Sequence, residues 1–115
     1  MSTLTIKLSD FTETPGSRFR HQHSEPGHSG EEFREQKIIP ALKDAMSNKS
    51  IILIDLDNVA GWPITFIDEA FGKLGNVFTF DSLKEHLFVS CKDDPAIVLD
   101  VWECIKDYVI SHNPI

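Results

Sequence analysis

The chain has 115 residues, 41% of them hydrophobic and 25% charged, a composition typical of one compact domain rather than of a disordered segment. Its formal net charge of -7 argues against nonspecific binding to nucleic acid or to an anionic membrane, because either would require a positive patch. No apolar run reaches the roughly 20 residues that a membrane-spanning helix needs. We therefore expect a single cytoplasmic domain over residues 1–115, with neither nucleic acid nor membrane as a partner.

The first half of the chain predicts a strand, a loop-rich segment and a helix. Residues 4–8 alternate apolar and polar side chains, as a half-buried strand does. Residues 14–30 are rich in Pro, Gly, Ser and His, which predicts loops and turns, with a short strand at residues 18–20 as one option. Ser29 and Glu32 have the spacing of a capping box, so a helix should begin there, bend at Pro40 and end near residues 47–49.

The second half begins with a nearly continuous Ile/Leu run at residues 50–56. Such a run predicts a strand covered on both faces, and therefore helices on two sides of a sheet. A helix should follow from residue 66 to about residue 74, with Gly75 as its left-handed cap.

The last elements are a short helical turn, a strand and a long helix. Asp81 or Ser82 is expected to cap the turn, and residues 87–91 to form the strand. Asp94 is the expected cap of the last helix, with Pro95 at its first position. The order of elements predicts an α/β layered domain.

The segment between the central strand and the next helix, residues 57–65, is the predicted functional region. A strand followed by a helix with a hydroxyl side chain at its exposed N-terminus favours anion binding. The reason is that free backbone N–H groups and the helix dipole both attract negative charge. Thr65 has two interpretations, a helix cap or a phosphate acceptor. Asp68 and Glu69 are first-turn acids that complement the helix dipole and would repel a phosphate on Thr65.

A rival interpretation is catalytic. Asp55 and Asp57 directly follow the apolar strand and resemble the nucleophile motif of haloacid-dehalogenase-like phosphatases, in which Mg²⁺ sits between two carboxylates. That family is larger, however, and carries a distant lysine and a second acidic pair, whereas only 58 residues follow Asp57 here. The alternative interpretation is a strand that ends in solvated acids.

Other side chains that could bind ligands have less specific patterns. His21, His23 and His28 are either loop histidines or ligands of a divalent metal. Trp62 is either a lid over the core or an exposed aromatic anchor for a partner. The two cysteines of the chain, at positions 91 and 104, lie in apolar segments, which favours reduced, buried thiols.

Four segments carry a resemblance to a known family: residues 15–18 (Pro-Gly-Ser-Arg), residues 29–34 (Ser-Gly-Glu-Glu-Phe-Arg), residues 39–42 (Ile-Pro-Ala-Leu) and residues 65–74, which include Phe-Ile-Asp-Glu-Ala-Phe-Gly. Together they resemble the small bacterial STAS-like family of unknown function, also catalogued as DUF4325. The resemblance implies a small STAS-like layered fold with helices packed on a mixed sheet, related to the anti-sigma factor antagonists.

The resemblance also implies a mechanism. In the antagonists, a serine at the start of the helix after a central strand is phosphorylated by a histidine-kinase-like ATPase, and Thr65 lies at or near that position. The antagonists usually present an Asp-Ser-Ser type sequence there, whereas this chain has one hydroxyl and no acid directly before it.

We therefore expect a noncatalytic regulatory or protein-interaction module with no cofactor. Its expected partner is a histidine-kinase-like ATPase or another regulator. The predicted docking residues surround the candidate phosphate acceptor: Asp57, Asn58, Trp62, Thr65, Asp68 and Glu69.

Overall fold

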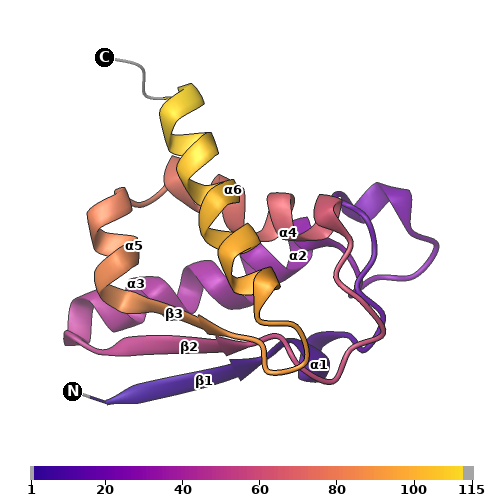
Figure 1. The fold of residues 1–115 in the computed structure, drawn as a ribbon, viewed down its shortest axis with the longest axis horizontal. Coiled ribbons are helices and arrows are strands. Elements are labelled where there is room, and N and C mark those ends of the chain that lie inside the picture. The colour runs from indigo at the N-terminus through magenta and orange to yellow at the C-terminus, as the bar shows by residue number, and fades with distance from the viewer. Residues whose placement is uncertain (1, 113–115) are drawn as a thin grey trace.

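The computed structural model describes residues 2–112, and its centre is a three-stranded parallel sheet (Figure 1). The strands are β1 (Thr3–Lys7), β2 (Ile51–Asp55) and β3 (Leu87–Ser90), in the order β1-β2-β3. The predicted α/β layered class is confirmed. The sheet differs from the expected mixed sheet, because both described pairings are parallel. The connections from β1 to β2 and from β2 to β3 both contain helices and return the chain to the same end of the sheet, as parallel pairing requires.

The central strand β2 is the predicted Ile/Leu run, and its two faces are covered unequally. Ile52 and Ile54 are buried, whereas Ile51 and Leu53 are half-buried. The expectation that both faces are covered is thus only partly met. The more deeply buried face, with Ile52 and Ile54, is the one that packs in the hydrophobic core.

The first long helical segment is interrupted before a proline. It consists of α2 (Gly30–Phe33), a π-helical turn η2 (Arg34–Ile38) and α3 (Ile39–Asn48). Pro40 has no N–H with which to continue the α-helical pattern, and the turn before it widens so that Ile39 N–H donates to Arg34 C=O. The bend predicted at Pro40 therefore takes the form of a π turn. Lys49, with φ of 54°, ends α3 as a left-handed cap.

The segment between β1 and α2 is loop-rich, as predicted. It contains a short helix α1 (Leu8–Phe11), which the sequence did not indicate, and a 3₁₀ turn η1 (Arg20–Gln22). Residues 18–20 form no strand in the described chain. Ser29 Oγ accepts from Glu32 N–H at 3.2 Å, which confirms the predicted cap of α2.

After β2 come α4 (Ile64–Phe71), the 3₁₀ turn η3 (Gly72–Asn76) and α5 (Phe80–His86). The predicted left-handed cap at Gly75 is wrong, because α4 tightens into η3 and Gly75 lies within that turn without a positive φ. The cap of α5 is Thr79, whose side chain accepts from Ser82 N–H, rather than Asp81 or Ser82.

The chain closes with α6 (Ala96–His112), the longest helix. Asp94 Oδ1 accepts from Ala96 N–H at 3.2 Å, which agrees with the predicted cap. Within residues 2–112, no helix combines the length and apolar character that crossing a membrane requires.

An aromatic core holds α4 against α2. The Phe33 ring lies 6.0 Å from that of Phe66 and 6.4 Å from that of Phe71, and all three side chains are fully buried. The two helices approach closely at Gly30, where an added Cβ would lie 2.6 Å from Phe66 C=O. This packing fixes the position of α4 and of the loop that precedes it.

Candidate functional site

The loop between β2 and α4 is fixed to the rest of the domain by Asp57. The two carboxylate oxygens of Asp57 accept from Lys92 N–H at 3.0 Å and from Asp93 N–H at 2.8 Å, in the loop that follows β3. Donation from the backbone of Asp93 and then of Lys92 holds the pKa of Asp57 below its ordinary value. The loops that follow two neighbouring strands are therefore joined through one side chain.

The two aspartates of the phosphatase interpretation, Asp55 and Asp57, both bond to backbone N–H groups at the end of β2 and in the loop after β3. Asp55 Oδ1 accepts from Asp57 N–H at 2.9 Å, so each carboxylate of the pair accepts from backbone N–H groups. In the part of the chain that the structure describes, no group of three or more His, Cys, Asp or Glu side chains is arranged to hold a metal ion. The pair thus matches the turn-forming role of aspartates at a strand end.

Trp62 closes the same loop over the core. Its indole Nε1–H donates to Leu56 C=O at 2.8 Å, and its half-buried ring packs against the buried core residues. Of its two interpretations, this contact favours the lid. Asn58 lies on the outer side of the loop, exposed and with φ of 65°, a left-handed conformation that asparagine tolerates.

Thr65 is the second residue of α4 and does not cap it. The N-cap position is Pro63, whose φ of -57° suits helix entry, and no side chain caps this end of the helix. Thr65 is half-buried. Ile64 beside it is 60% exposed. The front end of α4 therefore exposes the apolar side chain of Ile64, with Thr65 half-buried beside it.

The two acids that follow, Asp68 and Glu69, have different environments. Asp68 is partly exposed and forms an ion pair with Arg18 from the loop-rich segment. Glu69 is 1% exposed, so the prediction that it lies on a docking surface is wrong. Its Oε2 lies 2.8 Å from Arg34 Nη1 and 2.8 Å from Lys73 Nζ, which compensates the burial of its charge.

A family model described as the STAS-like domain of unknown function (DUF4325) matches residues 29–95. The chain belongs to this family. The match begins at the cap of α2 and ends just before α6, so it includes β2, α4 and β3. Neither the curated proteins nor the solved structures contain a significant match to this STAS-like domain.

Three cations of this STAS-like domain belong to the site but were not predicted: Arg18, Arg34 and Lys73. Arg34 lies four residues before the buried Ile38 on the same helical segment, which is the spacing of residues on one helix face. The sequence pattern could therefore have predicted that Arg34 is buried. Lys73 lies four residues after Glu69, the usual spacing of a helical ion pair. Arg18 lies in a loop, 50 residues before its partner Asp68, and no local sequence pattern predicts this pairing.

The histidines of the loop-rich segment take part in its internal packing. His23 Nε2 accepts from Ser17 N–H at 3.0 Å, and His28 Nδ1 lies 2.8 Å from the Thr12 hydroxyl. His21 stacks on the Phe19 ring. The hydrogen bonds of His23 and His28 give these two imidazoles a structural role in shaping the loop.

Both cysteines carry free thiols, as predicted. Cys91, directly after β3, is buried, and Cys104 on α6 is half-buried. Burial raises the pKa of both thiols, that of Cys104 to about 11, with Asp68 as the next contributor. Their protonated state at neutral pH agrees with a role in packing.

Proposed function

We propose that this STAS-like domain is a noncatalytic regulatory module that binds a protein partner through the front end of α4 and the loop before it. The docking surface consists of Asn58, Trp62, Ile64, Thr65 and Asp68. Asp57 and Glu69 act from beneath this surface, as supports rather than as contacts. The expected partner is a histidine-kinase-like ATPase or another regulator, as the resemblance to the anti-sigma factor antagonists implies.

The exposed end of α4 is the observation that carries this proposal. Ile64 keeps 60% of its surface exposed, although Phe66 and Ile67 shortly after it are part of the core. An apolar side chain presented on a rigid frame suits the centre of an interface, because binding then removes apolar surface from water with little ordering. The frame is rigid because Asp57 and Trp62 tie the loop to backbone groups.

Thr65 is the proposed point of control. A phosphate there would add nearly two negative charges one helical turn before Asp68, whose carboxylate forms an ion pair with Arg18. The added charge would make the surface beside Ile64 more negative and more strongly hydrated. We expect phosphorylation to weaken docking for that reason.

Phosphorylation is tested by incubating the domain with ATP and candidate histidine-kinase-like ATPases and locating phosphate by mass spectrometry. The matched control is Thr65→Val, which keeps the side-chain shape and removes the hydroxyl. Phosphate at Thr65 in the wild type and none in the control would support the proposal. Phosphate absent from Thr65 in every reaction would contradict its role as acceptor.

Docking is tested separately by binding experiments with the same ATPases. Ile64→Asp should abolish binding, and Leu99→Asp, at a 69% exposed leucine on α6, should leave it unchanged. Equal effects of the two substitutions would show that the front end of α4 is not the docking surface.

A further inference from the structure

One edge of the sheet is open. β1 is the first strand in the order β1-β2-β3, so only one of its two edges has a neighbouring strand. Four of its five residues are exposed, and Leu4 is 54% exposed although it is a large apolar side chain. In Figure 1, β1 forms the lower border of the sheet and no other strand lies beyond it.

The direction of the backbone groups in β1 follows from its pairing. Ile51 N–H donates to Ser2 C=O at 3.1 Å, and the parallel register pairs Leu4 with Ile52. In a parallel ladder, alternate residues direct their N–H and C=O groups to the same neighbour. Leu4 and Ile6 therefore bond to β2, whereas the N–H groups of Thr3, Thr5 and Lys7 point out from the open edge.

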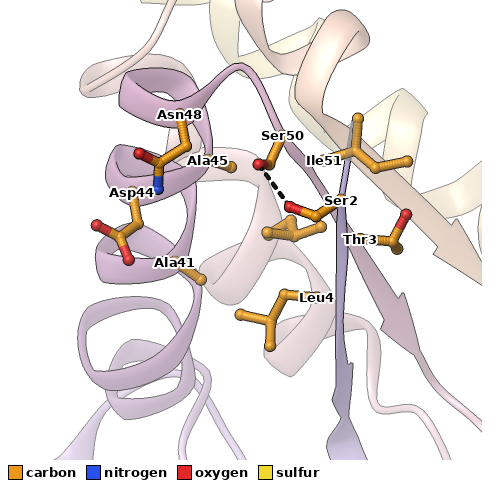
Figure 2. A pocket seen from close by; sticks show the side chains of 10 residues that line it. Ser2, Thr3, Leu4, Ala41, Asp44, Ala45, Asn48, Ser50 and Ile51 are labelled. Carbon is orange, nitrogen blue, oxygen red and sulfur yellow. Dashed lines mark hydrogen bonds between the residues drawn. The ribbon is translucent and has the colours of Figure 1, made fainter.

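A groove lies beside this edge, between β1 and α3, with a cavity volume of about 330 Å³. Figure 2 shows Leu4 pointing toward Ala41 of α3, whereas Thr3 points to the other side of the strand. Ala45 and Ile52 add further apolar lining to the groove. An open strand edge with a groove for alternate side chains is the arrangement that binds an added β-strand.

We propose that this edge binds the β1 edge of a second copy of the chain. The two strands would run antiparallel about a two-fold axis at Thr5. Two hydrogen bonds would link the two Thr5 residues. Each Lys7 would form two more with Thr3 of the other copy, one from Lys7 N–H to Thr3 C=O and one from Thr3 N–H to Lys7 C=O. Ile6 of each copy would lie opposite Leu4 of the other, at the mouth of the groove, and cover its exposed surface.

The charges and the size of this edge fit a weak homodimer. Lys7 is the only charged residue of β1. The two-fold axis would place the two Lys7 residues four residues apart along the strands, which is roughly 13 Å. This separation exceeds the Debye length of about 8 Å at physiological salt, so the repulsion between the two lysines is largely screened. A strand of this length spans about 17 Å, so the pairing covers less than the roughly 800 Å² per partner of a stable interface. We therefore expect a dissociation constant in the micromolar range or above. This inference does not depend on the proposed function of the α4 surface.

The test measures mass by sedimentation equilibrium as the concentration rises from micromolar to near-millimolar. The wild type should pass from monomer to dimer. Thr5→Pro removes an N–H that points outward rather than to β2, and should raise the dissociation constant by roughly tenfold or more, since edge strands tolerate proline. Thr5→Ser keeps that N–H and should dimerise like the wild type.

Amide hydrogen exchange at Thr3 and Thr5 provides a readout that does not depend on any substitution. Both amides should be protected at high concentration and exchange freely at low concentration. A wild type that stays monomeric, or a dimer that leaves these amides unprotected, would overturn the proposal. Should Thr5→Pro fail to fold, Leu4→Lys takes its place, since this residue is exposed and its charge would face Ile6 of the second copy.

Discussion

Arg34 and Glu69, which are 35 residues apart in the sequence, form a buried ion pair that joins the helical segment before β2 to the helix after it. Arg34 Nη1 donates both to the Glu69 carboxylate and to the Glu69 backbone C=O. Glu69 Oε1 is buried without a hydrogen bond in the described chain and lies 4.0 Å from Arg18. The pair is therefore one part of a cluster that connects three segments.

Removing the cation of this pair should destabilise the fold. We expect Arg34→Met to lower the free energy of unfolding by about 3 kcal/mol, because it leaves the Glu69 carboxylate buried with less compensation. Urea denaturation measures this loss. The control is Lys37→Met, an exposed lysine on the same segment. An Arg34 variant as stable as the control would show that the pair contributes nothing.

The close approach of α2 to α4 gives a second prediction. Gly30→Ala should lower the free energy of unfolding by roughly 2 kcal/mol, because the new Cβ would lie 2.6 Å from Phe66 C=O and 3.0 Å from Glu69 Cβ. The matched control is Gly61→Ala, where nothing lies within 4 Å of the added atom. Thermal unfolding of both variants measures the difference, and a smaller loss at Gly30 than at Gly61 would contradict the packing.

Asp57 should make stability depend on pH in the acid range. Its pKa is lowered in the folded chain by donation from Asp93 and Lys92 N–H, so it stabilises the fold fully above the ordinary aspartate pKa of about 3.9. That stabilisation is lost as the pH falls through the lower pKa of the folded state. Asp57→Asn should therefore be less stable at pH 7 and show a shallower acid decline, measured by denaturation from pH 7 to pH 3. A variant with the wild-type pH profile would contradict this.

The Cys104 thiol should react slowly with thiol-specific reagents. With a pKa of about 11, its thiolate population at pH 8 is about two orders of magnitude below that of an ordinary cysteine. A disulfide reagent followed by absorbance measures the rate, and the unfolded chain in denaturant is the control. Equal rates in the folded and unfolded chains would contradict the environment described for this residue.

The elements that depend on local chemistry could be predicted from the sequence. The cap formed by Ser29 and Glu32 could be predicted because the two residues are only three positions apart. The Ile/Leu run predicted a buried strand, and β2 lies within it. The start of α4 was predicted at residue 66, with Thr65 as a possible cap, which is two residues too late. Pro63, with its fixed φ, occupies the N-cap position, so the helix begins at Ile64.

The electrostatic part of the site could not be predicted, because it depends on contacts between distant segments. Glu69 was interpreted as a first-turn acid on the surface, since local spacing places Thr65 and Asp68 beside it. Its partner Arg34 reaches it only because the aromatic core brings α2 and α4 together. The short α4 also ends in a 3₁₀ turn, where tertiary packing against α6 replaces the expected cap at Gly75.

The central claim is that the front end of α4 is a docking surface, and site-specific photocrosslinking in the native cell tests it most directly. A photoreactive amino acid replaces Ile64 in one variant and Leu99 in the other, two exposed apolar positions on different helices. We predict a discrete protein adduct at position 64, absent at position 99 and lost when Thr65→Glu is added. No adduct at position 64, or the same adducts at both positions, would contradict the account.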